Sequence, residues 1–128
     1  MAIEVGIQGL AEALVEQADT AKEVGSGDLL VYATPCMVAL MEGAAWESIA
    51  PYLAEGESSV GTKMDVTHLS ATPVGMSVRA ESVVTAVEGR KVTFSITAYD
   101  EAGEIGKATH ERVVIKTERF LEKTYDKL

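Results

Sequence analysis

The spacing of hydrophobic residues changes along the chain, from a helical period to an alternating one. Between residues 34 and 52, apolar side chains recur at helical spacing, at Met37, Val38, Leu40, Met41, Ala44, Ala45 and Ile49. From residue 60 onward, apolar and polar residues alternate, as they do in the strands of a half-buried sheet. The pattern therefore predicts one long helix followed by a sheet.

The alternating part divides into predicted strands at 60–70, 74–87, 91–99 and 105–116. Glycine-containing turns separate the last three, and turns this short join antiparallel neighbours. Residues 117–128 fit either a short polar helix or a frayed tail. The expected fold class is α+β, with the helix wrapped by an antiparallel sheet. Because such a sheet leaves an edge strand and an apolar surface, dimerisation is expected.

The predicted helix carries a start signal at its first residues. Pro35 suits the first helical position, and Thr34 is expected just outside the helix as its N-terminal cap. Apolar residues then occupy nearly every side, which is typical of a buried helix. Glu42 interrupts that surface, and a buried carboxylate is costly unless it is paired or its pKa rises. We therefore expect a compensating partner for Glu42.

The first third of the chain allows two interpretations. Four apolar residues have the spacing of a helix face: Ile3, Ile7, Leu10 and Leu14. Residues 10–15 fit a strand equally well, because periodicity alone does not separate the two. Asp19 is a candidate cap for a helical turn at 19–24. A glycine-containing loop at 25–28 and an extended segment at 29–32 then lead into the long helix.

Composition narrows the function classes. The 128 residues fit one domain, over 1–128. The net charge of −9 argues against sequence-independent nucleic-acid binding, which needs a basic surface. The first residues lack the basic region of a signal peptide, and no apolar run is long enough to span a membrane. A cytoplasmic protein without nucleic-acid or membrane partners is expected.

The sequence gives little support for a metal site or a disulfide bond. The single cysteine, Cys36, excludes an internal disulfide and argues against a structural zinc site. Its position near a helix N-terminus favours a lowered thiol pKa, but core packing is the preferred interpretation. His110 and Glu111 suggest a zinc-protease motif. That motif fails because Val114 stands where the second histidine is needed, so no metal is expected.

Glu42 and His68 are the first candidates for chemistry. Glu42 is either a functional carboxylate or a structural one satisfied by the backbone or a hydroxyl. His68 shares one strand face with Met64 and Val66. A histidine on such a face is more often a satisfied core residue than a catalyst. If the helix lies across that face, Glu42 and His68 can meet.

A second set of candidates lies on the strands. His110, Arg112, Val114 and Lys116 share one face of the last strand. This is either a solvated or edge-strand face, or a surface where Arg112 or Lys116 meets a ligand phosphate or an acidic partner. Gly61 precedes His68 and is either a bulge position or a backbone N–H donor to a substrate.

Three blocks occur together in this sequence: ATPCMVALME, GTKMDVTH and THERVVI. With these blocks, and from about Val24 onward, the chain resembles the hotdog-fold thioesterases. Within them it is most similar to the group of the fluoroacetyl-CoA-specific thioesterase. None of the blocks is decisive alone, but the combination is specific. The resemblance implies acyl-CoA hydrolysis on a long helix wrapped by an antiparallel sheet.

The resemblance also implies roles for individual residues. By the family's motif, the catalytic residues fall on Thr34, Glu42 and His68, and substrate-binding residues on Gly61 and Arg112. The family's active sites lie at the interface of a homodimer whose two sheets join. A dimer of dimers is an alternative assembly. No cofactor is expected, because coenzyme A is part of the substrate.

The segment before Thr34 departs from the fluoroacetyl-specific enzyme, which has a longer, phenylalanine-bearing lid there. In GSGDLLVYA the only large side chains are Leu29, Leu30 and Tyr32. This difference argues against fluoroacetyl specificity and leaves acyl-CoA hydrolysis intact, so a small or short-chain acyl-CoA is the expected substrate. Two other function classes stay open. One is a non-catalytic domain that binds acyl-CoA or a hydrophobic ligand, and the other is a hotdog hydratase or dehydratase.

Helix geometry adds an expectation about Thr34 and Glu42. On one straight helix, residues eight positions apart lie about 12 Å apart along the axis. The two side chains are therefore not expected to form a hydrogen bond within one chain. Either the substrate spans them, or Thr34 reaches the partner's Glu42.

Overall fold

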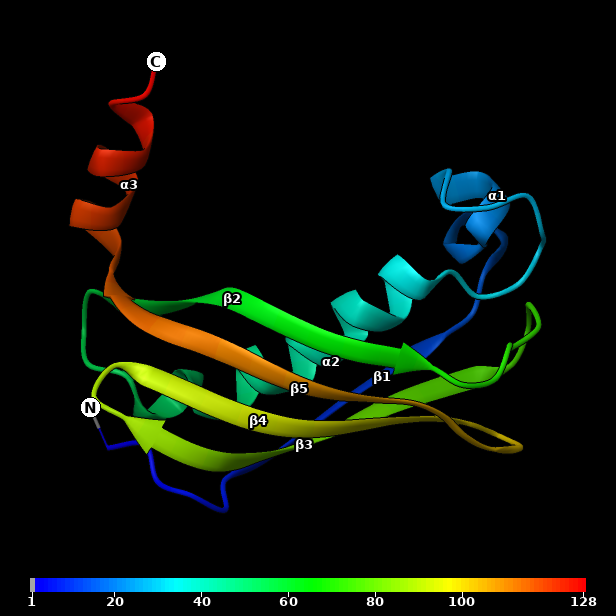
Figure 1. Ribbon diagram of the computed structural model, residues 1–128, viewed down its shortest axis with the longest axis horizontal. Helices are drawn as coiled ribbons and strands as arrows, with labels where there is room; N and C mark the ends of the chain where they lie inside the picture. The colour runs from blue at the N-terminus through cyan, green and yellow to red at the C-terminus, as the bar shows by residue number, and fades with distance from the viewer. Residues whose placement is uncertain (1) are drawn as a thin grey trace.

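The computed structural model describes residues 2–128, in which one antiparallel sheet packs against the long helix α2 (Thr34–Ile49). The strands are β1 (Gln8–Leu14), β2 (Glu57–His68), β3 (Ser77–Glu88), β4 (Lys91–Asp100) and β5 (Gly103–Lys116). Their order across the five-stranded sheet is β1-β3-β4-β5-β2. Figure 1 shows α2 lying along one face of the curved sheet. The predicted α+β architecture is confirmed.

Alternating side chains decide which face of the sheet packs on α2. Along β3 and β4 every second residue is buried: Val78, Ala80, Ser82, Val84, Val92, Phe94, Ile96 and Ala98. The alternation of a half-buried sheet, predicted from residue 60 onward, is therefore confirmed in both strands. The second predicted strand begins later than expected, at Ser77, because Gly75 adopts a φ of 97° in the turn before it. A φ in that region suits glycine and interrupts an extended chain.

The N-terminal segment forms a strand. β1 pairs with β3 in an antiparallel register, with Ala11 opposite Ala80. Gly9 lies so close to α2 that a Cβ atom there would come 2.3 Å from the carbonyl oxygen of Ala44. Because only a glycine permits this approach, β1 can cross directly over the helix backbone.

The short helix α1 (Ala21–Val24) is capped by Thr20, whose hydroxyl accepts a hydrogen bond from the Glu23 N–H. The prediction of Asp19 as this cap was therefore wrong. Asp19 ends the preceding 3₁₀ helix, Gln17–Asp19, and its carboxylate accepts from the backbone N–H of Glu16. The cap of α1 therefore lies one residue after the predicted one, because the 3₁₀ helix Gln17–Asp19 precedes α1.

Helix α2 differs from its prediction in two respects. It begins at Thr34, with Ala33 as an N-cap that makes no side-chain hydrogen bond, so the predicted capping role of Thr34 was wrong. The helix is also buried on one side only. Trp46 is 45% exposed, and the side chain of Glu42 is 42% exposed. The sheet of one chain covers the side of Met37, Met41, Ala44, Ala45 and Ile49, and leaves the other side open.

The two edges of the sheet are β1 and β2, whereas β5 lies between β4 and β2. His110 and Arg112 on β5 are buried, so the interpretation of their face as solvated or as an edge was wrong. A 3₁₀ helix, Ala50–Tyr52, leads out of α2 toward β2. At the other end of the chain, α3 (Thr117–Tyr125) projects from the end of β5 (Figure 1).

Candidate active site

Thr34 and His68 form the first polar pair against α2. Thr34 lies in the first turn of the helix, and His68 is the last residue of β2. Alternation along β2 turns Met64, Val66 and His68 to the same face. The Thr34 Oγ1 and the His68 Nδ1 are 2.7 Å apart and share a hydrogen bond. The Thr34 hydroxyl thus serves His68 instead of capping the helix.

The other ring nitrogen of His68 is buried. Among residues 2–128, the His68 Nε2 has no hydrogen-bond partner. Burial lowers the pKa of His68, and the nearby backbone of Ser70 partly opposes this. The ring is therefore biased toward its neutral form, which can accept a proton. A hollow of about 270 Å³ adjoins His68 and Thr34, between Tyr32 and the segment 69–71.

Glu42 and Arg112 form the second pair, near the middle of α2. The Arg112 Nη1 lies 3.6 Å from the Glu42 Oε2. Arg112 is only 6% exposed, and Ser59 on β2 accepts from its Nε and its Nη2, at 2.9 and 3.0 Å. Burial lowers the pKa of Arg112, and Glu42 opposes that effect. The predicted compensating partner of Glu42 is thus a guanidinium held by Ser59.

His110 completes this second cluster. Its Nδ1 is 2.7 Å from the carbonyl oxygen of Lys63, and its Nε2 is 3.2 Å from the Arg112 Nη1. A carbonyl oxygen only accepts, so Nδ1 carries the proton and Nε2 accepts from Arg112. Burial lowers the pKa of His110, the Lys63 carbonyl opposes this, and Arg112 lowers it further.

Gly61 lies on the edge strand β2. Because it has no side chain, it leaves room for the Glu42 carboxylate next to this strand. A Cβ atom at Gly61 would lie 2.6 Å from the Glu42 Oε2, 3.2 Å from the His110 Cε1 and 3.4 Å from the Arg112 Nη1. The pairing of β2 with β5 is interrupted between Gly61 and Lys63. Of the two interpretations of Gly61, the structure therefore shows the bulge. Its N–H as a substrate donor stays a prediction.

The two clusters are separate within one chain. Among the described residues, no hydrogen bond joins Glu42 to Thr34 or to His68. The absence of a Thr34–Glu42 bond follows from their spacing along α2, as expected. The possible meeting of Glu42 with His68 is not seen within one chain, where His68 bonds Thr34 and Glu42 pairs with Arg112.

Other sequence candidates lie outside these clusters. Cys36 packs against the core, and burial, with a smaller effect from Asp19, raises the pKa of its thiol. A raised pKa disfavours the nucleophilic thiolate, which agrees with the packing interpretation. Within residues 2–128, no group of three His, Cys, Asp or Glu side chains is placed to hold a metal ion. That same part of the chain has no helix of the length and apolar character needed to cross a membrane.

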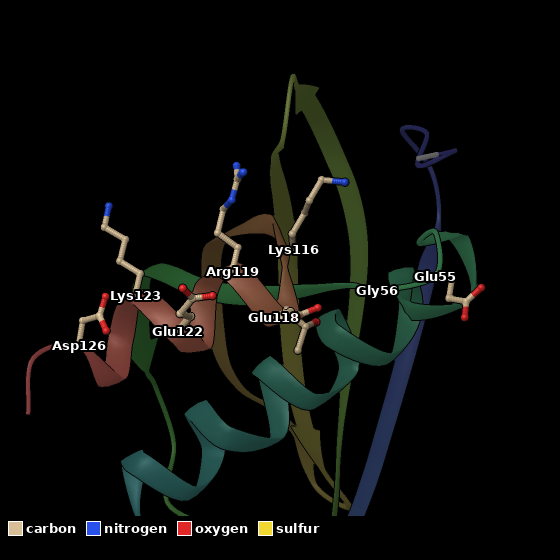
Figure 2. A pocket seen from close by; sticks show the side chains of 9 residues that line it. Glu55, Gly56, Lys116, Glu118, Arg119, Glu122, Lys123 and Asp126 are labelled. Atoms are coloured by element: carbon tan, nitrogen blue, oxygen red, sulfur yellow. The ribbon is translucent and has the colours of Figure 1, made fainter.

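Another hollow lies at α3, where it is lined by none of the residues of the two clusters. It measures about 760 Å³ and is lined by charges of both signs. In Figure 2, Lys116, Arg119 and Lys123 extend to one side of α3. Glu118 and Glu122 lie away from that row. Lys116 is exposed at this hollow. It does not pair with Glu42, whereas Arg112 does.

Sequence reasoning missed Ser59 as a member of the second cluster, and it missed that His110 is buried there. Ser59 gave no signal, because its contact to Arg112 joins residues 53 positions apart. His110 did give one. Counting back from the apolar Val114 in steps of two residues places Arg112 and His110 on the same face of the strand. In β5 that face is the buried one.

The family described as the fluoroacetyl-CoA-specific thioesterase matches residues 15–118 of this chain. That span includes both clusters and every strand except β1. The chain belongs to this family. The predicted relation to hotdog-fold thioesterases is confirmed, and so is the prediction that the chain is a thioesterase.

Individual members of the family agree with this assignment. A fluoroacetyl-CoA thioesterase from Streptantibioticus cattleyicolor is 46% identical over 97 residues, which cover 76% of this chain and 70% of that protein. A solved structure of the fluoroacetyl-CoA thioesterase superposes with a TM-score of 0.93 at 36% identity, covering 100% of this chain and 99% of the other. A hot-dog-like protein from Thermanaerovibrio acidaminovorans gives a TM-score of 0.89 at 28% identity, covering 98% and 93%.

Proposed function

We propose that this thioesterase hydrolyses a small or short-chain acyl-CoA thioester to the free acid and coenzyme A, at a site shared by two copies of the chain. The observation that carries the proposal is the separation of two polar clusters in a member of a thioesterase family. One cluster offers a hydroxyl and a neutral imidazole, Thr34 and His68, at 2.7 Å. The other offers a half-exposed carboxylate, Glu42, beside a guanidinium.

Glu42 supplies the base or the nucleophile of the reaction. In the first route it takes a proton from water, whose oxygen attacks the thioester carbon as the C–S bond breaks. In the second route the carboxylate attacks that carbon itself, the C–S bond breaks and the coenzyme A thiolate leaves, and water then hydrolyses the mixed anhydride to the free acid and the Glu42 carboxylate. Its 42% exposed side chain gives a substrate access in both routes.

His68 and Thr34 act at the leaving group. The buried Nε2 of His68 orients water, or takes up a proton released by the attacking water and hands it to the departing thiolate of coenzyme A. Thr34 holds the ring through Nδ1, and this bond fixes which face of the imidazole meets the substrate. We assign the N–H of Gly61 as the donor to the oxyanion, which is supported by the position of Gly61 at the β2 bulge next to Glu42. These roles need side chains, backbone and water, with no cofactor.

The edge strand β2 is the proposed interface. It has 12 residues and pairs with β5 on one side only. An unpaired edge of this length is a template for a second strand, and a two-fold axis would pair β2 with its copy. Such a homodimer brings Thr34 and His68 of one chain toward the partner's Glu42. It also covers the exposed side of α2, where Trp46 is 45% exposed.

The hollow beside His68 supports a small acyl group. That hollow measures about 270 Å³, below the roughly 300 Å³ at which pockets for drug-sized ligands begin. Tyr32 is buried at its wall, and Leu29 and Leu30 on the preceding loop are 63% and 54% exposed. We therefore place a short acyl chain there. Arg112 is already engaged by Ser59, His110 and Glu42, which favours its role as an acid partner over phosphate binding.

The test is thiol release from a panel of acyl-CoAs, from acetyl to long-chain, with the purified chain and with Glu42→Gln. Wild type is expected to turn over the short members, and Glu42→Gln to lose at least about 10²-fold in kcat. Glu47→Gln is the matched control, because Glu47 is exposed on the same helix. Binding of acyl-CoA without release of thiol by the wild type would overturn the proposal.

A further inference from the structure

The second cluster contains a buried histidine that the proposed mechanism does not use. His110 is 1% exposed, and its ring stacks on Phe94 with centroids 5.8 Å apart. The imidazole has two polar contacts, the Lys63 carbonyl and the Arg112 Nη1. Packing against Phe94 explains a ring at this position. It does not explain why the ring has a nitrogen facing Arg112.

The Lys63 carbonyl fixes the tautomer of His110. Regular pairing between β2 and β5 breaks between Gly61 and Lys63, which brings this carbonyl to the Nδ1 at 2.7 Å. Since the carbonyl only accepts, the proton of the neutral ring sits on Nδ1. Nε2 is then left with a lone pair directed at the guanidinium, 3.2 Å from its Nη1.

Three contacts fix the direction of the Arg112 guanidinium. Ser59 accepts from Nε and from Nη2, and His110 accepts from Nη1. Nη1 carries two hydrogens, so its second hydrogen remains for the Glu42 Oε2 at 3.6 Å. Because the guanidinium is rigid and planar, these three contacts leave the remaining N–H of Nη1 little freedom to change its direction.

We propose that His110 is a positioning residue of the thioesterase reaction: its Nε2 accepts from Arg112 and thereby aims the guanidinium at the carboxylate of Glu42. The inference rests on the proposed function of Glu42. His110 does not touch the substrate. It acts through Arg112, which limits the positions open to a carboxylate that is otherwise half exposed.

Two substitutions separate this role from packing. His110→Gln keeps a side-chain carbonyl oxygen that can accept from Arg112, whereas His110→Met has a similar length and no such acceptor. Both lose the ring and its stacking on Phe94. We expect His110→Met to lower kcat by about tenfold or more with KM within about twofold, and His110→Gln to stay within about threefold of wild type. Equal kcat values for the two variants would overturn the proposal.

Controls address folding and the dependence on Glu42. Phe94→Leu removes the stacking partner without touching a polar contact, so it is expected to lower the melting temperature and to leave kcat unchanged. If His110→Met does not fold, His110→Asn replaces it, because Asn can still donate to Lys63 but has no atom at the Nε2 position.

A double-mutant cycle tests whether His110 acts through Glu42. In a Glu42→Gln background, His110→Met is expected to leave the residual rate unchanged, whereas additive losses would contradict action through Glu42. The two proposals fail differently. A fully active Glu42→Gln removes the proposed function, whereas an inactive Glu42→Gln with a wild-type His110→Met removes only the positioning role.

Discussion

The hydroxyl of Thr34 and the imidazole of His68 are hydrogen-bonded at 2.7 Å, across 34 positions of sequence. The bond joins the first turn of α2 to the last residue of β2. It therefore fixes the ring relative to the helix that carries Glu42. Thr34→Val keeps the shape and removes the hydroxyl, and it is expected to lower kcat by about tenfold to a hundredfold. Thr34→Ser, measured by the same thiol-release assay, should retain most of the activity, and equal losses in both variants would contradict this.

Mixing two inactive variants tests whether the site is shared between chains. In a dimer of Thr34→Val with Glu42→Gln, one site receives both substitutions and the other receives neither. Random subunit exchange should therefore restore about a quarter of wild-type activity. Activity is measured before and after the variants are mixed and incubated, with light scattering to follow the assembly. No recovery despite proven exchange would mean that each site lies within one chain.

Gly61→Ala tests the close approach of the edge strand to Glu42. The added Cβ would lie 2.6 Å from the Glu42 Oε2, so the carboxylate must move. We expect a loss of kcat of about tenfold or more, because a misplacement of about 1 Å is costly in catalysis. Gly43→Ala is the control, since a Cβ there meets nothing within 4 Å and alanine favours a helix. Wild-type kcat in Gly61→Ala would show that Glu42 tolerates displacement.

Two histidines with lowered pKa values predict how stability depends on pH. Burial lowers the pKa of both His68 and His110 below the ordinary 6.5. The unfolded chain therefore binds protons more readily, so stability is full above pH 6.5 and falls as the pH drops below it. Urea unfolding at about pH 7.5 and about pH 5.5 should show a lower midpoint at the acidic value. His110→Gln should reduce that difference, and an unchanged midpoint in the wild type would contradict the burial effect.

Much of the fold could be predicted from the local pattern. The long helix and the strands after residue 57 follow from periodicity, because side chains on a helix or strand repeat at fixed intervals. The N-terminal strand could not be separated from a helix. Its identity depends on pairing with β3, nearly 70 positions away, and on Gly9 touching the α2 backbone.

The candidate residues were predictable one by one, but their partners were not. Glu42 stood out as a carboxylate in an apolar segment, and His68 as a histidine on an apolar strand face. Within one chain the two side chains have different partners, Thr34 for His68 and Arg112 for Glu42. His68 bonds Thr34, and Glu42 pairs with Arg112, because of the positions along α2 at which β2 and β5 cross the helix.

The sequence by itself determined the long helix, the alternating strands after it, the family and the residue types available for chemistry, because periodicity and motif spacing are local properties. Only the tertiary structure decided that Thr34 bonds His68 and that Arg112 lies between Glu42, His110 and Ser59. Those contacts arise where β2, β5 and α2 cross. The register of β2 against β5, with its bulge after Gly61, sets which atoms come within bonding distance there.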